Sequence, residues 1–292
     1  MKIIKKQKGS VLFVSCMILF SAMLAIIAGC NPHRPLPSFT ICDIPYGPDK
    51  ENTMDISLPE GRTADTPVII LVHGGAWTGG DKNDFSFLRR YFSDRGYAAI
   101  SVNYRLARIK GTGMRNILDD MDYVIAYVKE ISDDWTFSRE VIFLTGYSAG
   151  GHIALLYSFS RATGGTIRGV VSYCGLADLT DPDLEISLSR MHEKGSPLAK
   201  KPFDRIGFVT GPDRNMRIAY SPQFITRDIP VLLVCGKMDD IIPWSQSGNL
   251  HKKMKEQGFD STLHVYPKMG HDITPYYGEI MKITEQWIRD RM

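Results

Sequence analysis

The sequence predicts an α/β fold, with an eight-stranded, mostly parallel sheet flanked by helices and a small cap insertion. Short β-branched runs alternate with segments of helical periodicity from about residue 66 onward, which is typical of βαβ units. The periodicity fails around residues 176–222, where several prolines, glycines and charges occur. A structureless loop of that length is unusual, so this stretch is predicted to form a cap over the C-terminal edge of the sheet. Residues 39–292 as a whole suit one large domain.

The first 29 residues have the organisation of a secretory signal peptide. Four lysines within the first eight residues precede an apolar run from Val11 to Ala28. The ending Ile27-Ala28-Gly29-Cys30 resembles the lipobox of bacterial lipoproteins, which implies cleavage before Cys30 and acylation of its side chain. The alternative is an uncleaved signal anchor, because the apolar run is just long enough to span a bilayer. Either way, we expect an exported protein anchored to a membrane on the periplasmic or cell-surface side, with the Pro-rich residues 30–38 as an extended spacer.

Eight runs of residues are predicted to form the strands. Six have the composition of buried parallel strands, namely Val68–Val72, Ala98–Asn103, Val141–Thr145, Ile167–Tyr173, Ile229–Val234 and Thr262–Tyr266. Two earlier stretches, around Phe39–Tyr46 and Met54–Leu58, are predicted to form a leading antiparallel hairpin.

The clearest helical spacing precedes the strand Val141–Thr145. Its apolar positions step by four, three, four and three residues, at Ile117, Met121, Val124, Val128 and Ile131. One face of this helix is therefore expected to pack on the sheet, while Asp119, Asp122 and Lys129 face water. In the cap, Met191, Phe203 and Phe208 are expected to line a pocket.

The formal net charge of the chain depends on its N-terminal lysines. Without the four N-terminal lysines the formal net charge changes from +3 to −1, and the other basic residues are dispersed, which argues against a nucleic-acid partner.

Three of the five cysteines lie outside the predicted signal peptide and its acylation site, that is, apart from Cys16 and Cys30. Cys174 and Cys235 end apolar runs and are predicted to be buried small hydrophobes, although export would permit a disulfide. No cysteine, Cys42 included, has a metal-ligand spacing, and no metal is expected.

The segment Gly146-Tyr147-Ser148-Ala149-Gly150 lies between an apolar strand and a helical stretch. A nucleophilic serine on such a sharp turn projects above the sheet, and glycines two residues to either side leave room for the crowding. The helix N-terminus at Ser148 also favours developing negative charge. Ser148 is therefore the candidate nucleophile, against the alternative of a chance Gly-rich turn.

A second Gly-rich segment, His73-Gly74-Gly75-Ala76-Trp77, directly follows the strand Val68–Val72. Acyl transfer needs backbone N–H donors aimed at the oxyanion, and glycine lets the main chain approach without a Cβ in the way. The oxyanion hole is therefore expected to use the N–H of Gly74 or Gly75 together with that of Ala149. His73 is expected to hold the loop.

The serine needs a base and a carboxylate, and two later loops supply candidates. The strand Ile229–Val234 is followed by Asp239 and Asp240, and the strand Thr262–Tyr266 is followed by His271. Both loops are predicted at the edge where Ser148 emerges, and the order Ser, Asp, His is the one that α/β-hydrolases use. The residues alone leave Asp239 and Asp240 as alternatives. The other histidines, His152 among them, are expected to be packed or on the surface.

Several motifs together resemble the esterase/lipase branch of the α/β-hydrolases. They are His73-Gly74-Gly75-Ala76-Trp77 with Gly79-Gly80-Asp81-Lys82, Ser101-Val102-Asn103-Tyr104-Arg105-Leu106, Gly-Tyr-Ser-Ala-Gly-Gly-His and Gly-Lys-Met-Asp-Asp-Ile-Ile-Pro. More narrowly, from about Met54 to the C-terminus, they resemble the BD-FAE-like carbohydrate esterases related to acetylxylan and feruloyl esterases. The resemblance implies the α/β-hydrolase fold and places the acid three residues after a glycine, at Asp239. Ala76 stands where hormone-sensitive-lipase-like members have a third glycine. Trp77 and Tyr147, inside the two motifs, are expected to line the substrate pocket.

These residues predict acyl-ester hydrolysis by Ser148, His271 and Asp239, with no metal or organic cofactor. The resemblance and the predicted location favour acetyl or feruloyl esters of glycans as substrates. Kynurenine formamidases carry a similar His-Gly-Gly-x-Trp segment, so an amidase or a serine peptidase of the same fold is an alternative. A binding lipoprotein without catalytic activity is the alternative from another class.

Overall fold

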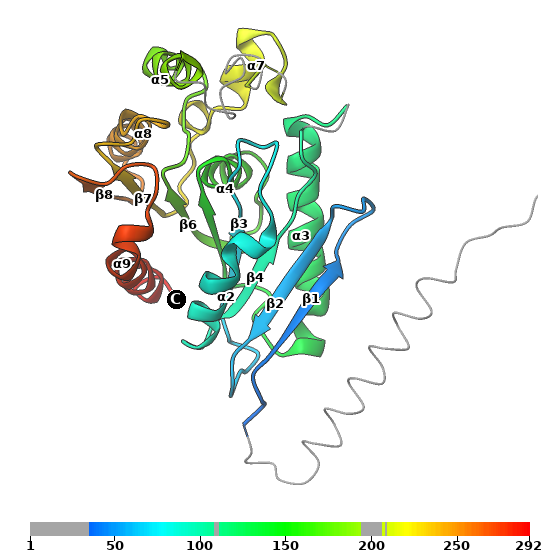
Figure 1. Ribbon diagram of the computed structural model, residues 1–292. Coiled ribbons are helices and arrows are strands. Elements are labelled where there is room, and N and C mark those ends of the chain that lie inside the picture. The colour runs from blue at the N-terminus through cyan, green and yellow to red at the C-terminus, as the bar shows by residue number, and fades with distance from the viewer. Residues whose placement is uncertain (1–34, 108–110, 194–205, 208) are drawn as a thin grey trace, which may run out of the picture.

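The computed structural model describes residues 35–107, 111–193, 206–207 and 209–292 (Figure 1). One eight-stranded sheet runs through it in the order β1-β2-β4-β3-β5-β6-β7-β8. The strands are β1 (Phe39–Pro45), β2 (Thr53–Leu58), β3 (Val68–Val72), β4 (Ala98–Val102), β5 (Ile142–Tyr147), β6 (Ile167–Tyr173), β7 (Val231–Gly236) and β8 (Ser261–Tyr266). β2 pairs antiparallel with both β1 and β4, and the other neighbours pair in parallel. The predicted fold class and leading hairpin are confirmed.

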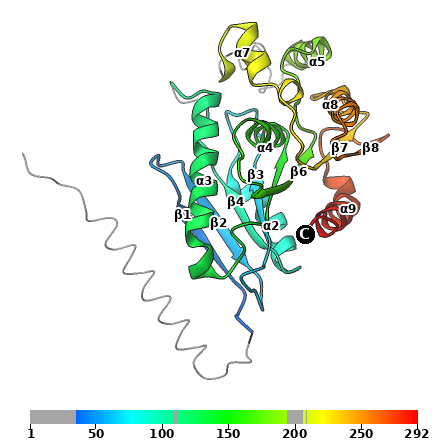
Figure 2. The same cartoon turned by 180° about the vertical axis from the view of Figure 1, so that it is seen from behind.

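Helices cover both faces of the sheet (Figures 1 and 2). They are α2 (Ser86–Ser93), α3 (Met114–Trp135), α4 (Ala149–Ser160), α5 (Pro182–Glu193), α7 (Arg214–Ala219), α8 (Ser245–Glu256) and α9 (Tyr277–Arg289), with short 3₁₀ turns η1 (Lys82–Phe85), η3 (Pro222–Phe224) and η4 (Thr274–Tyr276). Residues of α3, α4 and α8 share one hydrophobic cluster, and those of α2 and α9 share another. In β3, Ile70 belongs to the first cluster while Ile69 and Leu71 belong to the second, because successive side chains of a strand point to opposite faces.

The predicted amphipathic helix is α3. All five residues of its predicted apolar face are buried, as the spacing requires. On the other side Asp122 is exposed, whereas Asp119 and Lys129 are half-buried. Arg161 pairs with both Asp119, at 2.7 Å, and Asp122, at 2.5 Å, and Lys129 Nζ donates to the Thr166 hydroxyl at 2.6 Å.

The largest shift from a predicted strand start is in β7. β7 begins at Val231 rather than at Ile229 and continues to Gly236. Pro230 has no N–H to donate to a ladder, although its carbonyl still accepts a hydrogen bond from Val170 N at 2.9 Å. The three cysteines outside the N-terminal segment are free, and Cys174 and Cys235 are buried as predicted.

The segment predicted as a cap contains α5 and α7, which lie together above the sheet in Figures 1 and 2. The predicted pocket residues Phe203 and Phe208 lie outside the described residues, as does the side chain of Met191. The predicted signal peptide and Cys30 also lie outside them. Among the helices that the structure describes, none combines the length and the apolar character needed to cross a membrane.

Candidate active site

Ser148 lies at the junction of β5 and α4, in a backbone conformation that few non-glycine residues adopt. Its φ is 55° and its ψ is −120°. The turn is held by a hydrogen bond from Ser148 N to Tyr173 O at 2.8 Å. A Cβ at Gly146 would lie 2.2 Å from Gly150 O, and one at Gly150 would lie 1.9 Å from Val72 O. The two glycines are therefore required by close backbone packing, which is the physical reason for the motif.

The loops after β7 and β8 bring a carboxylate and an imidazole to this serine. His271 Nε2 lies 3.1 Å from Ser148 Oγ, and His271 Nδ1 lies 2.8 Å from Asp239 Oδ2. Because a carboxylate only accepts, Nδ1 carries the proton and Nε2 is free to accept the serine hydroxyl. Such an arrangement can remove a proton from the serine and stabilise the imidazolium that forms.

The structure separates the two candidate acids. The side chain of Asp239 is fully buried, and its Oδ1 accepts the N–H groups of Ile241 at 2.9 Å and Ile242 at 2.8 Å. Asp240 is exposed, and its carbonyl accepts the hydroxyl of Ser187 on α5 at 2.6 Å. Of the two aspartates, Asp239 is the one that reaches His271.

The oxyanion-loop residues lie beside the serine. A Cβ at Gly74 would be 3.3 Å from Ser148 Cβ and 3.1 Å from the Tyr147 ring. Among the described residues, the N–H groups of Gly74, Gly75 and Ala149 have no hydrogen-bond partner. Free N–H donors at the start of α4 and on an adjacent turn can bind developing negative charge.

His73 and Tyr104 hold the oxyanion loop, Gly74–Trp77, through hydrogen bonds and ring stacking. His73 Nδ1–H donates to Gly74 O at 2.8 Å, and its ring stacks on that of Tyr104 with centroids 4.3 Å apart. Tyr104 Oη–H donates to His73 O at 3.1 Å. Burial lowers the pKa of His73, so its ring is neutral near pH 7. The sequence singled out Tyr104 only as part of a shared motif, because its contact is made across 30 residues of chain.

The two predicted pocket residues have different surroundings. Tyr147 is half-buried, and its Oη–H donates to the carbonyl of His271 at 2.9 Å, which ties the imidazole loop to the serine turn. Trp77 lies in the core with 3% of its surface exposed. Its indole N–H donates to His152 Nδ1 at 3.3 Å.

Cys174 is a site residue that the sequence analysis missed. Its sulfur, a carboxylate oxygen of Asp239 and a ring nitrogen of His271 all lie within 4.8 Å of one another. That spacing alone fits a metal site. Burial, reinforced by the charge of Asp239, raises the pKa of the Cys174 thiol well above its usual value. The two ring nitrogens of His271 are already engaged by Ser148 and Asp239, which is the arrangement that proton transfer requires.

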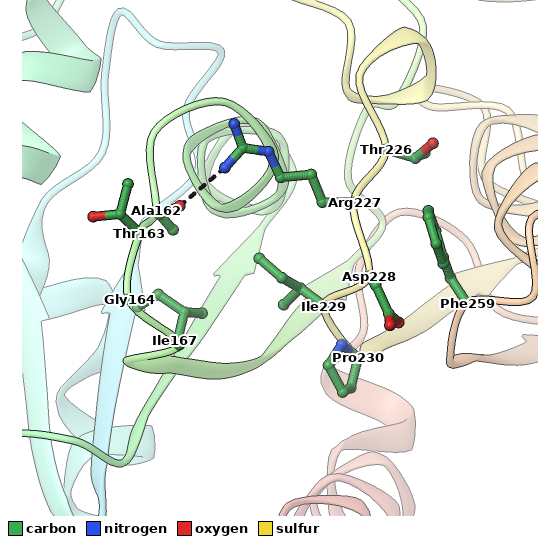
Figure 3. A pocket seen from close by; sticks show the side chains of 11 residues that line it. Ala162, Thr163, Gly164, Ile167, Thr226, Arg227, Asp228, Ile229, Pro230 and Phe259 are labelled. Carbon is green, nitrogen blue, oxygen red and sulfur yellow. Dashed lines mark hydrogen bonds between the residues drawn. The ribbon is translucent and has the colours of Figure 1, made fainter.

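A surface pocket of about 560 Å³ lies at the edge of the sheet opposite to Ser148, where the parallel strands begin. Figure 3 shows the residues that line it. Gly164 and Ile167 line it at the start of β6, and Arg227 and Pro230 line it before β7. The Arg227 guanidinium donates to Ala162 O at 3.0 Å and thereby caps the end of α4. Ser148 follows the C-terminal end of β5, so this pocket is remote from the candidate active site.

Comparison with known proteins gives esterases and a formamidase. Esterase LipQ of Mycobacterium tuberculosis is 30% identical over 246 residues, which cover 78% of this chain and 55% of LipQ. Kynurenine formamidase of Danio rerio is 29% identical over 147 residues, which cover 48% of this chain and 47% of that protein. The chain thus spans about half the length of the curated relatives it matches.

Among solved structures, a truncated carbohydrate esterase from gut microbiota superposes with a TM-score of 0.66 at 20% identity, covering 86% of this chain and 97% of that one. This likeness shows that the two chains share the α/β-hydrolase fold. Residues 54–254, well over half of the chain, match the sequence model of the BD-FAE family, and the protein therefore belongs to the BD-FAE family.

Proposed function

We propose that the protein is a serine carboxylesterase that hydrolyses acyl esters through an acyl-enzyme intermediate. One observation carries this proposal: His271 lies 3.1 Å from the Ser148 hydroxyl and 2.8 Å from the buried carboxylate of Asp239. Serine alone is a weak nucleophile, and a base that is itself oriented by a carboxylate activates it.

The reaction follows from this geometry in two halves. Ser148 Oγ attacks the ester carbonyl while His271 Nε2 takes its proton, and the N–H groups of Gly74 or Gly75 and of Ala149 stabilise the oxyanion. The alcohol leaves with the proton from His271, which gives an acyl group on Ser148. Water then attacks the acyl carbon with His271 as base, and the acid is released. Each oxyanion donor is worth about 3 kcal/mol in such reactions.

Ser148→Ala tests the proposal, with Ser158→Ala as the matched control. Ser158 lies on the same helix, is fully buried and has no partner for its hydroxyl among the described residues. We expect kcat for p-nitrophenyl acetate to fall by about 10⁴-fold or more in Ser148→Ala and to stay near the wild-type value in Ser158→Ala. A fluorophosphonate probe should label the wild type and the control only. A wild-type protein that neither turns over aryl acetates nor takes up the probe would refute the proposal.

For the substrate we propose acetyl or feruloyl esters of glycans. Membership of the BD-FAE family and the fold shared with a gut carbohydrate esterase support this class. The test is a panel that pairs acetylated xylo-oligosaccharides and feruloyl arabinose with simple alkyl and aryl esters of the same acids. A kcat/KM for the sugar esters at least tenfold above that for the matched alkyl esters would support the proposal, and the reverse order would contradict it.

An amidase is the second candidate, because kynurenine formamidase of Danio rerio matches half of the chain. N-formylkynurenine and p-nitroacetanilide added to the panel separate the two functions. A kcat/KM for either amide above that for every ester would replace the esterase proposal.

We also propose that the chain is exported and acylated at Cys30. The lysine-rich start, the apolar run and the sequence before Cys30 support this. After expression in a bacterium with labelled palmitate, the wild type should carry label and sediment with membranes, and Cys30→Ala should carry none. Equal labelling of the two proteins would contradict the proposal.

A further inference from the structure

His152 joins three segments that are far apart in the sequence. It lies one helical turn after Ser148 on α4 and is fully buried. Its Nδ1 lies 3.3 Å from Trp77 Nε1 in the oxyanion loop, and its Nε2 lies 2.8 Å from Tyr220 O at the end of the cap segment. The Trp77 and His152 rings meet edge to face, at an interplanar angle of 83°.

The two partners fix which nitrogen of His152 carries the proton. An indole N–H only donates, so Nδ1 of His152 accepts, and a backbone carbonyl only accepts, so Nε2 donates. Both bonds therefore need the neutral imidazole with its proton on Nε2. Burial keeps the ring in this form, because it lowers the pKa of His152 to about 4.

Trp77 ends a run of three residues with positive φ, two of which are not glycine. Gly75, Ala76 and Trp77 have φ values of 101°, 50° and 58°. Left-handed conformations of residues other than glycine cost energy and persist only where the surroundings hold them. Two anchors act on Trp77: its carbonyl accepts the N–H of Ala107 at 2.8 Å, and its indole N–H binds His152.

We propose that His152 is a positioning residue, which holds Trp77 so that the strained turn presents the N–H groups of Gly74 and Gly75 to the oxyanion. This inference rests on the proposed esterase function. His152 is not a base in the reaction, because both its nitrogens are occupied by Trp77 and Tyr220. We expect its side chain to affect the substrate through the oxyanion loop, Gly74–Trp77. Misplacing the donors by about 1 Å lowers a rate by on the order of 100-fold.

Two substitutions of His152 each keep one of its two side-chain hydrogen bonds and remove the other. In His152→Asn the amide oxygen replaces Nδ1 as acceptor for the indole, and the donor to Tyr220 is lost. In His152→Gln the amide nitrogen reaches toward Tyr220 O in place of Nε2, and the acceptor for the indole is lost. Trp77→Phe removes the indole N–H from the other side, and Ser158→Ala is the control on the same helix.

We expect kcat for p-nitrophenyl acetate to fall about 10- to 100-fold in His152→Gln and in Trp77→Phe, with KM within threefold of the wild-type value. Interactions made only in the transition state lower kcat in this way. His152→Asn should keep at least ten times the kcat of His152→Gln. The double variant Trp77→Phe/His152→Gln should lose no more than either single variant, because both break one contact.

The Trp77 indole resonance in a ¹H–¹⁵N spectrum of the full-length protein, assigned with Trp77→Phe, gives a readout that does not need activity. It should stay in place in His152→Asn and move upfield in His152→Gln. The proposal is overturned if losses multiply in the double variant, if His152→Asn loses as much kcat as His152→Gln, or if the resonance is the same in both. An inactive wild type would instead refute the esterase function and leave this resonance test standing.

Discussion

Burial distinguishes two adjacent aspartates that share one turn. Asp239 accepts hydrogen bonds from His271 and from two backbone N–H groups, so its carboxylate is fixed and oriented. Asp240 is exposed to solvent. The two adjacent carboxylates therefore differ in burial and in contact with His271.

Asp239→Asn should therefore lower kcat by on the order of 10⁴-fold, because the amide favours the wrong tautomer of His271. Asp240→Asn should change kcat less than threefold, since its exposed side chain does not reach the imidazole. Steady-state hydrolysis of p-nitrophenyl acetate by the two variants measures this directly. If Asp240→Asn had the larger effect, the assignment of the acid would move by one residue.

Close packing gives a second prediction for a single residue. Gly150 is the second residue of α4, and an added Cβ would lie 1.9 Å from Val72 O, so Gly150→Ala should lower the free energy of unfolding by about 3 kcal/mol or more. Gly278 is the second residue of α9 and has open space around it. Gly278→Ala should leave stability unchanged or raise it by up to about 1 kcal/mol. Urea denaturation compares the pair, and equal effects would contradict the steric argument.

At the level of elements, a buried cluster of ion pairs holds the segment that follows the oxyanion loop in the sequence. Asp55 of β2 is fully buried and bonds Lys82 of η1 at 2.9 Å and Arg89 of α2 at 3.1 Å. Lys82 also bonds Asp43 of β1 at 2.7 Å. The segment after Trp77 is thereby fixed to the antiparallel hairpin and to α2.

Asp55→Asn should be strongly destabilising, because it leaves two nearly buried cations facing an uncharged amide. Breaking one partner of a buried ion pair typically costs about 3–5 kcal/mol. Asp65, which is exposed in the loop before β3, provides the control Asp65→Asn. Urea midpoints for the two variants give the comparison, and a loss below about 1 kcal/mol in Asp55→Asn would show that the cluster is not stabilising.

The same elements show what the sequence could predict. Strand runs, the α3 periodicity and the Gly-x-Ser-x-Gly turn are local patterns, and all eight strands lie close to their predicted bounds. The residues alone left Asp239 and Asp240 as alternatives, because the choice depends on which way the turn folds, and only the family resemblance selected Asp239. The contacts of His152 and Cys174 were missed for a related reason. Their partners lie in other segments, and no local period records such contacts.

In the whole molecule, hydrogen bonds hold both ends of the cap segment, near residues 177–181 and at Tyr220, against the sheet domain. The Gln246 side chain on α8 accepts the N–H groups of Ala177 and Asp178, both at 2.8 Å, and donates to Asp181 at 2.7 Å. On the other side, His152 binds Tyr220 O. Hydrogen bonds therefore link the nucleophile helix, the oxyanion loop and the cap base, so we expect a group at their junction to affect global stability.

His152 makes that stability depend on pH. Its pKa is about 4 in the folded protein, against the ordinary value of 6.5 for a histidine side chain, so between these values the unfolded chain binds more protons than the folded one. The contribution of neutral His152 to the free energy of unfolding is fully present above pH 6.5. It is lost as the pH falls to about 4, and the loss is at most about 3 kcal/mol. Urea denaturation of the wild type between pH 7 and 4 should show this loss. In His152→Gln, which has no group titrating at this position, the decline should be shallower by most of that amount. Parallel declines would mean that His152 titrates in the folded protein as it does in the unfolded chain.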